Sequence, residues 1–244
     1  MLTLASDDPL AVAVTAAIRG GDLDGLRRLL AAHPGLAGGR IVKRGEAAGE
    51  RSLLHIAVDW PGHYPRTAEV IRTLAAAGAD PGARFVGSHR ETPLHWAASN
   101  DDVTAIDALV EAGADIEAPG SVLGGGAPLT DATGFGQWNA ARRLLELGAR
   151  PTLHDAATLG LLAVVEVSVA AGAEPEDIAS AFWGACHGGQ LSTAQYLLSQ
   201  GADLNKPGHG GLTPLDIALT SEDGPLLDWL TSAGARTRDE IPRV

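Results

Sequence analysis

The residues most able to do chemistry in this sequence are histidines, aspartates and one cysteine. His55, His95 and His154 each follow a leucine in similar heptapeptides. Imidazoles bind zinc, so three at matched places could indicate a metal site. A zinc ion holds its ligand nitrogens at about 2.0–2.1 Å, whereas equivalent positions on stacked helices lie roughly 8–10 Å apart. We therefore predict that these histidines are structural and that the chain binds no metal.

Cys186 and His187 are adjacent, and a thiol beside a base can form a thiolate nucleophile. Neighbouring helical residues point about 100° apart, so the two side chains are expected to face different surfaces. Cys186 is predicted to be a buried packing residue. As the chain's single cysteine, it excludes an internal disulfide and a multi-cysteine zinc site, and it indicates a reducing compartment.

Two carboxylates and a histidine could carry general acid–base chemistry. Asp131 and Asp155, with His187 nearby, could act on a ligand stacked on Trp96 or Phe135. The sequence has no nucleophile elbow, metal motif or nucleotide fingerprint to accompany them. A small-molecule-binding protein or enzyme is therefore the alternative hypothesis. The leading hypothesis assigns no catalytic residue and no cofactor.

The elements that position these residues repeat along the chain. Helix-opening segments with a leucine or phenylalanine anchor precede Gly-Ala-Asp-like endings, and the anchor-to-glycine distance is 19 residues in five cases and 24 in the first. This spacing predicts a unit of two helices and a turn. The anchors are Leu54, Leu94, Leu129, Leu153, Phe182 and Leu215, and the glycines are Gly78, Gly113, Gly148, Gly172, Gly201 and Gly234.

Departures from the repeat are informative. Val14 and His33 are again 19 residues apart and indicate a seventh, N-terminal unit. The longer first interval contains Pro and Gly residues within 60–65, which predict an extended turn between helices. Two connections between units, 149–152 and 173–181, are too short for a hairpin. No continuous strand is expected inside any anchor-to-glycine interval.

Composition limits the partners. The 244 residues are 45% hydrophobic and 20% charged, with a formal charge of −12, which excludes disorder and a basic nucleic-acid-binding surface. The N-terminal segment has no positive region typical of a secretory signal, and no apolar run is long enough to span a bilayer. We expect a cytoplasmic protein that binds neither nucleic acid nor membrane.

The heptapeptide TPLHWAA from Thr92, the Gly-Ala-Asp endings and the 33-residue step from Phe182 to Leu215 resemble ankyrin repeats over almost the whole chain. The resemblance implies an all-α solenoid of about seven helix-turn-helix units with hairpin-like finger loops, in a single domain over residues 1–244. It also implies a protein-interaction module that binds a protein partner through its concave face and fingers. The expected repeats are 11–35, 52–80, 92–115, 127–150, 151–174, 179–203 and 213–236.

Positions two, five and six after each anchor share one side of the first helix and are expected to be exposed on that concave face. The predicted binding residues are Asp59, Trp60, Trp96, Asn100, Asp131, Phe135, Asp155 and His187. A pocket is expected among Trp96, Asp131, Phe135, Asp155 and His187, with Gly134 and Gly184 leaving room. Its acidic lining favours an Arg or Lys side chain of a partner.

The first finger, residues 34–52, is unusually long and gathers four basic residues on an acidic chain. These are Arg40, Lys43, Arg44 and Arg51. The segment is expected to be a solvated loop, or else to contact an acidic partner.

Overall fold

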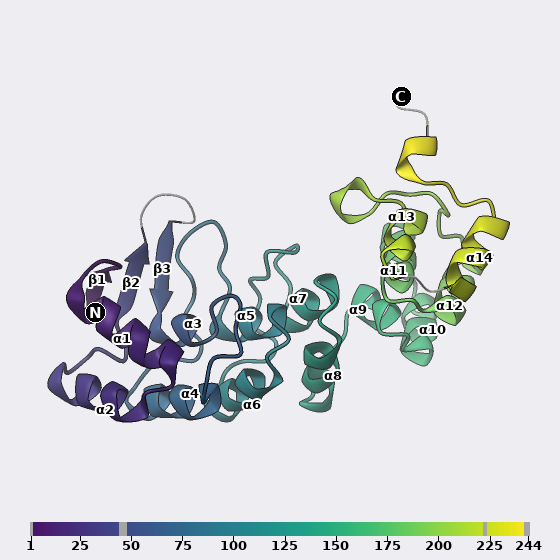
Figure 1. Ribbon diagram of the computed structural model, residues 1–244. Helices are drawn as coiled ribbons and strands as arrows, with labels where there is room; N and C mark the ends of the chain where they lie inside the picture. The colour runs from purple at the N-terminus through teal and green to yellow at the C-terminus, as the bar shows by residue number, and fades with distance from the viewer. Residues whose placement is uncertain (1, 44–47, 222–223, 242–244) are drawn as a thin grey trace. The chain divides into compact units, whose positions relative to one another are not determined.

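The computed structural model describes residues 2–43, 48–221 and 224–241, in which fourteen α-helices follow one another in seven pairs (Figure 1). Each predicted unit therefore has its two helices. The helices are α1 (Pro9–Gly20), α2 (Leu23–Ala32), α3 (Leu53–Ala57), α4 (Thr67–Ala76), α5 (Pro93–Ser99), α6 (Val103–Glu111), α7 (Pro128–Gly134), α8 (Trp138–Glu146), α9 (Leu153–Thr158), α10 (Leu162–Ala170), α11 (Pro175–His187), α12 (Leu191–Ser199), α13 (Pro214–Leu219) and α14 (Gly224–Ser232).

Contacts divide the chain into two compact units, residues 1–150 and residues 151–244, which we call unit 1 and unit 2. The boundary falls in the 149–152 connection, which is too short to form a finger. The interpretation of residues 1–244 as a single domain stays a prediction.

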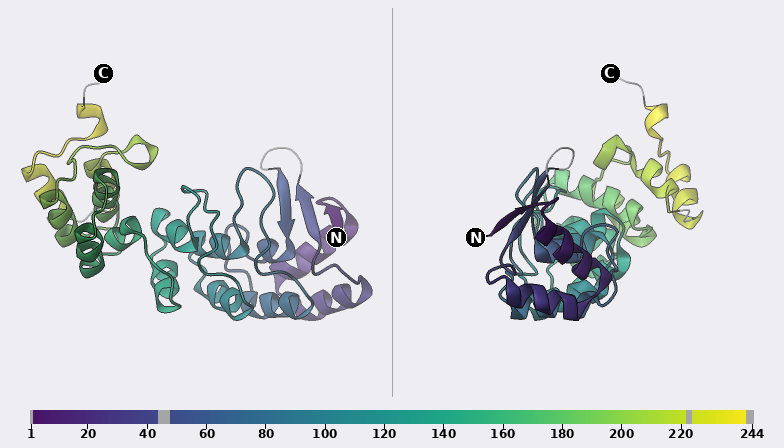
Figure 2. Two further views of the ribbon diagram at one scale, coloured as in Figure 1. Left: turned by 180° about the vertical axis from the view of Figure 1, so that it is seen from behind. Right: turned by 60° about the vertical axis from the view of Figure 1, so that its left-hand side comes forward.

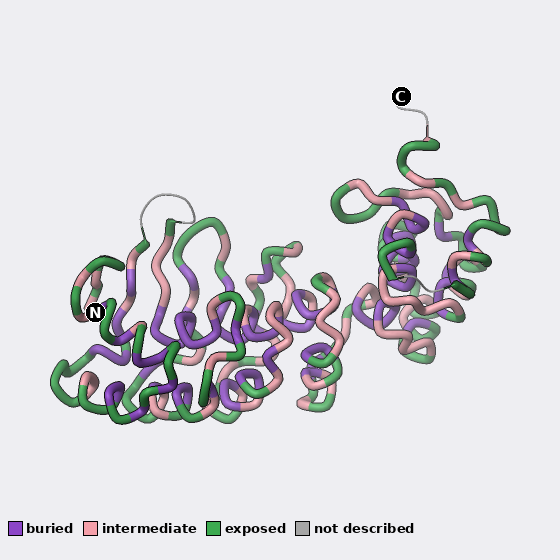
Figure 3. Tube along the Cα trace, viewed as in Figure 1, coloured by how far each residue is buried: buried purple, intermediate pink, exposed green. Residues whose placement is uncertain are grey.

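In unit 1 the first helices of each pair, α1, α3, α5 and α7, contact one another in sequence, and the second helices, α2, α4, α6 and α8, form a parallel row. The core lies between the rows, as the buried tube in Figure 3 indicates. The anchors Leu54, Leu94 and Leu129 are at most 1% exposed. Burying a leucine of this kind contributes about 1.5–3 kcal/mol. In unit 2, α11 contacts both α9 and α13 in the same manner.

Local sequence explains where the helices begin and end. Thr92 caps α5 with proline at the first helical position, and Thr213 caps α13 in the same way. The repeat-terminating glycines have positive φ, for example 94° at Gly113 and 98° at Gly148. Glycine adopts this left-handed conformation without steric cost, which ends each second helix.

A three-stranded sheet stands above the first helices of unit 1 (Figure 2). Strands β2 (Arg40–Lys43) and β3 (Gly49–Ser52) form the first finger as an antiparallel hairpin, and β1 (Thr3–Ala5) pairs in parallel with β2. The hairpin matches the predicted finger, but β1 lies outside the fingers and was not predicted from the sequence. It covers backbone groups of β2 that would otherwise form an open edge.

The second short connection, 173–181, contains no finger. Helix α11 begins within it, at Pro175, so most of the connection is helical. Helix α11 thus begins four residues before the expected repeat start at 179, and α1 begins two residues before the expected start at 11. The repeat bounds themselves stay predictions. No described strand falls inside an anchor-to-glycine interval, in agreement with the prediction. Among the described helices, none has the length and apolar character needed to cross a bilayer.

Candidate binding pocket

A pocket of about 540 Å³ opens beneath the fingers of unit 1. It is bordered by the extended turn after α3, by α5, by the C-terminal end of α7 and by residues of the second finger (79–92) and third finger (115–127). We call it the acidic–aromatic pocket. Its lining residues are Arg51, Asp59, Trp60, His89, Glu91, Trp96, Ser99, Asn100, Val122, Phe135 and Gln137.

Five of the eight predicted binding residues line this pocket. They are Asp59, Trp60, Trp96, Asn100 and Phe135. Trp60 is 80% exposed and Phe135 is 47% exposed, so both rings face solvent at the rim. Asp155 and His187 belong to unit 2 and are not among the pocket's lining residues.

Glu91 of the second finger is the polar centre of the pocket. Its carboxylate is 6% exposed and accepts hydrogen bonds from Trp96 Nε1 at 2.8 Å and from the Val122 backbone N–H at 3.0 Å. His89 Nδ1 lies 2.9 Å from it, in an ion pair when the imidazole is protonated. Glu91 therefore ties the second finger to α5 and to the third finger.

Arg51 separates the pocket from the N-terminal end of the first-helix face. Its guanidinium lies 5.6 Å from the centre of the Trp96 ring and 3.2 Å from Asp59, which also pairs with Arg19 at 2.7 Å. The Arg51 Nε is buried and has no hydrogen-bond partner among the described residues. The wall of the pocket thus already accommodates a guanidinium against Trp96.

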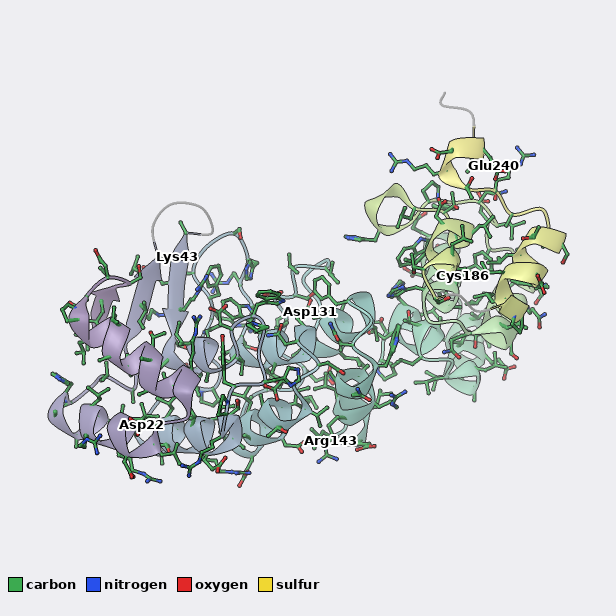
Figure 4. All side chains as sticks on the ribbon, viewed as in Figure 1. Asp22, Lys43, Asp131, Arg143, Cys186 and Glu240 are labelled. Carbon is green, nitrogen blue, oxygen red and sulfur yellow. The ribbon has the colours of Figure 1, made fainter. Side chains whose placement is uncertain are left out.

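Asp131 does not lie on the exposed face that the sequence analysis expected. It is fully buried on α7 (Figure 4), and its Oδ1 accepts a hydrogen bond from Ser121 of the third finger at 2.5 Å. Burial, together with the negative charge of Glu91, raises its pKa to about 8 despite the Ser121 hydrogen bond. Asp131 is therefore neutral at pH 7, and it holds the third finger rather than presenting a charge to a partner.

The expectation that position two is exposed is wrong in five of six units. Only Trp96 is partly exposed there. The others are Ile56, Asp131, Asp155, Gly184 and Ile217, and all are buried. This position falls in the first turns of the first helix, where fingers or the neighbouring helix cover it.

The N-cap of α9 lies one residue closer to its anchor leucine than the N-cap of α5 does, because the 149–152 connection is short. Thr152 caps α9 directly before the anchor Leu153, so Asp155 becomes the capping-box residue and its Oδ2 accepts from Thr152 N and Oγ1 at 3.0 and 2.7 Å. His154 instead contacts Ser180 through Nδ1 at 3.0 Å. Asp131 and Asp155 are thus both used in local structure, which does not favour the acid–base hypothesis.

His55 and His95 have the predicted structural role. Each closes a capping box through Nδ1, and each Nε2 reaches the next unit, at Glu91 O and Gly126 O respectively, both at 3.2 Å. Burial lowers the pKa of His55 to about 3 and that of His95 to about 4, so both imidazoles are neutral. Trp183 takes the same place on α11 and donates from Nε1 to Leu212 O at 2.9 Å.

Cys186 is buried on α11, as predicted, and burial raises its pKa to about 12 (Figure 4). A thiol held in this protonated state is a poor nucleophile. His187 stacks against Trp183 with ring centres 5.5 Å apart.

The two glycines expected to leave room in a pocket instead permit close packing. A Cβ at Gly134 would lie 2.2 Å from Leu123 of the third finger, and one at Gly184 would lie 2.5 Å from Thr158 Oγ1. Neighbouring side chains fill both spaces, so this part of the pocket prediction is wrong.

Asn100 also has a structural task. Its side-chain amide donates to Val58 O at 2.8 Å, and its backbone carbonyl lies 2.8 Å from His63 Nε2. These bonds hold the extended turn that carries Trp60 over the pocket.

The four basic residues of the first finger are not equivalent. Arg40 donates to Arg84 O at 2.8 Å, and Arg51 is built into the pocket wall. Lys43 is exposed at the end of β2 (Figure 4), and Arg44 lies outside the described residues. The segment is therefore a hairpin rather than a solvated loop.

His89, Glu91 and Ser121 were not predicted from the sequence, because fingers have no helical periodicity. One signal was present: Glu91 directly precedes the Thr92 cap, and a carboxylate there sits beside the first-helix face.

Comparisons with known proteins agree with the fold. Residues 54–155 match the family model described as ankyrin repeats (3 copies), and residues 182–231 match ankyrin repeats (many copies). The human ASB11 ankyrin repeat domain superposes with a TM-score of 0.52 and 19% identity, covering 97% of this chain and 100% of that one. No curated protein matches the sequence significantly. Because the two family matches together cover more than half of the residues, the chain belongs to the ankyrin repeat family.

Proposed function

We propose that this chain is a protein-interaction module that recognises an extended segment of a partner through the concave face and fingers of unit 1. Ankyrin repeats in general serve as protein-interaction modules. The partner's Arg or Lys side chain enters the acidic–aromatic pocket. The proposed setting is the cytoplasm, for which the single buried cysteine is suitable.

The observation that carries this proposal is the clustering of exposed apolar side chains at the acidic–aromatic pocket. Unit 1 has five large hydrophobic residues that are exposed in the described structure: Val12, Trp60, Val86, Val122 and Phe135. Three of them, Trp60, Val122 and Phe135, line the same pocket. Apolar groups clustered around a concavity are typical of interaction surfaces, whereas single ones are ordinary.

Charge supports a basic side chain as the occupant. Among the described residues, the only ion-pair partner of Glu91 is His89, which is charged only when protonated. A nearly buried carboxylate without a permanent countercharge attracts a cation. An aromatic face beside it adds cation–π attraction, and Arg51 already illustrates that geometry on Trp96.

The test uses a phage-displayed library of random dodecapeptides, selected on the immobilised full chain. Synthetic versions of enriched peptides are titrated against the wild type, Trp60→Ala and Phe135→Ala. Both rings are exposed, so their removal spares the fold. We expect an Arg or Lys in the enriched peptides and a Kd at least about five-fold weaker for each variant, the size of a significant interface contact.

Val167→Ala is the matched control, since this residue is 70% exposed on α10 of unit 2. Its Kd should equal that of the wild type. Wild-type affinity of both pocket variants, or a selection that yields no binding peptide, would refute the proposal.

A further inference from the structure

A second concavity of about 500 Å³ lies beside the acidic–aromatic pocket, between α1, β2 and α3. We call it the basic groove. Val12, Ile41 and Ile56 line its apolar part, and Arg19, Lys43 and Arg51 supply its charge. Arg51 lines both concavities and forms the wall between them.

Strand register explains why the hairpin presents these residues together. Ile41 and Arg51 are cross-strand partners, and Lys43 lies two residues along β2, so all three share one face of the hairpin. Arg40 and Val42 belong to the other face. The alternation therefore turns two of the finger's cations towards the first helices, with an apolar residue between them.

The groove is positively charged on an acidic chain. Against its three cations stands one paired carboxylate, Asp59, which bonds to both Arg19 and Arg51. Lys43 has no ion pair among the described residues, and the buried Arg51 Nε has no acceptor. The Lys43 ammonium thus remains available to an anion, above an apolar floor suited to methylene groups.

We propose that the basic groove binds an Asp or Glu side chain of the same partner segment whose Arg or Lys enters the acidic–aromatic pocket. This inference rests on the proposed function and adds a second, oppositely charged subsite to it. The two subsites would bind two oppositely charged side chains of the partner in a fixed order. The partner's acidic residue would lie at the first and second repeats, and its basic residue at the third and fourth.

The geometry sets the spacing of the pair. The groove is centred between α1 and α3 and the pocket lies at α5 and α7, which is one and a half to two helix spacings along the row. With adjacent first helices about 8–10 Å apart this is about 12–20 Å, and an extended peptide rises about 3.3 Å per residue. The acidic and basic residues should therefore be separated by about four to six positions. The alternation of side chains in an extended segment favours four or six over five, because only these place both side chains on the same face.

The experiment analyses the same dodecapeptide selection for a second enriched position. Enriched peptides should carry Asp or Glu at that spacing from the Arg or Lys. The best peptide and its Glu→Gln (or Asp→Asn) version are titrated against the wild type and against Lys43→Gln. Lys43 is exposed, so this change spares the fold.

Neutralising the acidic residue of the peptide should weaken its binding to the wild type by at least about five-fold. The same change should weaken binding to Lys43→Gln by less than about two-fold. This non-additivity is what a double-mutant cycle shows for two groups in direct contact. Lys206→Gln, at the chain's other lysine in unit 2, should retain the full effect.

Outcomes separate the two proposals. Peptides with an Arg or Lys that depend on Trp60, without an enriched acid or any coupling to Lys43, overturn the second subsite and leave the proposed function standing. Peptides that bind Trp60→Ala and Phe135→Ala normally overturn both.

Discussion

The two units have the same repeat but use it differently. In unit 1 the connections between repeats are long fingers that rise above the first helices and enclose two concavities. The connection that leads into unit 2 is so short that α9 follows α8 without a finger, and within unit 2 α11 begins at Pro175 in place of a finger. Glycines 184 and 188 then bring α11 close to α9. Finger length therefore decides whether the first-helix face becomes a pocket or a packed contact.

The largest effect is expected where that close contact is broken. A Cβ at Gly188 would lie 1.8 Å from the Thr158 carbonyl oxygen, so Gly188→Val should lower the free energy of unfolding by about 3 kcal/mol. Urea unfolding followed by far-UV circular dichroism measures this. Gly20→Ala is the control, since a Cβ there meets nothing within 4 Å, and it should stabilise α1 by about 0.5 kcal/mol.

The histidines sharpen the comparison. His95→Ala removes both the capping contact with Thr92 and the bond to Gly126 O, and should cost about 2 kcal/mol of stability. His154→Ala in unit 2 removes the contacts to Ser180 and the stacking on Trp183 but no capping-box contact, and should cost about 1 kcal/mol. Equal losses in urea unfolding would mean that the shifted cap of α9 has no energetic consequence.

The buried carboxyl of Asp131 makes unit 1 sensitive to pH. Its folded-state pKa of about 8 lies above the unfolded value of about 3.9, so the unfolded chain releases this proton first. Stability therefore falls as the pH rises between these values and levels off above the folded pKa.

His55 and His95 are neutral in the folded state but gain protons in the unfolded chain below about pH 7, which opposes this slope. Between about pH 7.5 and 8 they are neutral in both states, so Asp131 should dominate with a loss of at most about 1.4 kcal/mol per pH unit. Asp131→Asn should abolish this slope, whereas Asp24→Asn, at an exposed residue of α2, should keep it. The same slope in Asp131→Asn would show that another group titrates.

The smallest effects concern binding at the rim. Loss of the Trp60 ring should weaken peptide binding about five-fold, equivalent to about 1 kcal/mol, without changing the unfolding midpoint. A large change in that midpoint would instead indicate that Trp60 supports the extended turn.

Much of the fold could be predicted because it follows from periodic packing. The 19-residue interval gave the helix pairs, and the Thr92 and Thr213 caps gave helix starts. Strand β1 could not be predicted, because three residues carry no pattern and their pairing with β2 is long-range.

The site was predicted only in part for a similar reason. Trp60, Trp96 and Phe135 could be predicted because they lie at fixed positions, two or six residues, after the anchor leucine of their repeat. Glu91 and His89 were missed because a finger's path depends on tertiary contacts. The burial of Asp131 was missed because Ser121, ten residues earlier, covers it from such a finger.

The most direct test of the account is ¹⁹F NMR of the full chain labelled with 5-fluorotryptophan, titrated with the best selected dodecapeptide. Trp60 and Trp96 line the acidic–aromatic pocket, while Trp183 and Trp229 lie in unit 2. With resonances assigned by single Trp→Phe variants, the account predicts saturable shifts at Trp60 and Trp96 and none at Trp183 and Trp229. Shifts confined to Trp183 and Trp229 would contradict it.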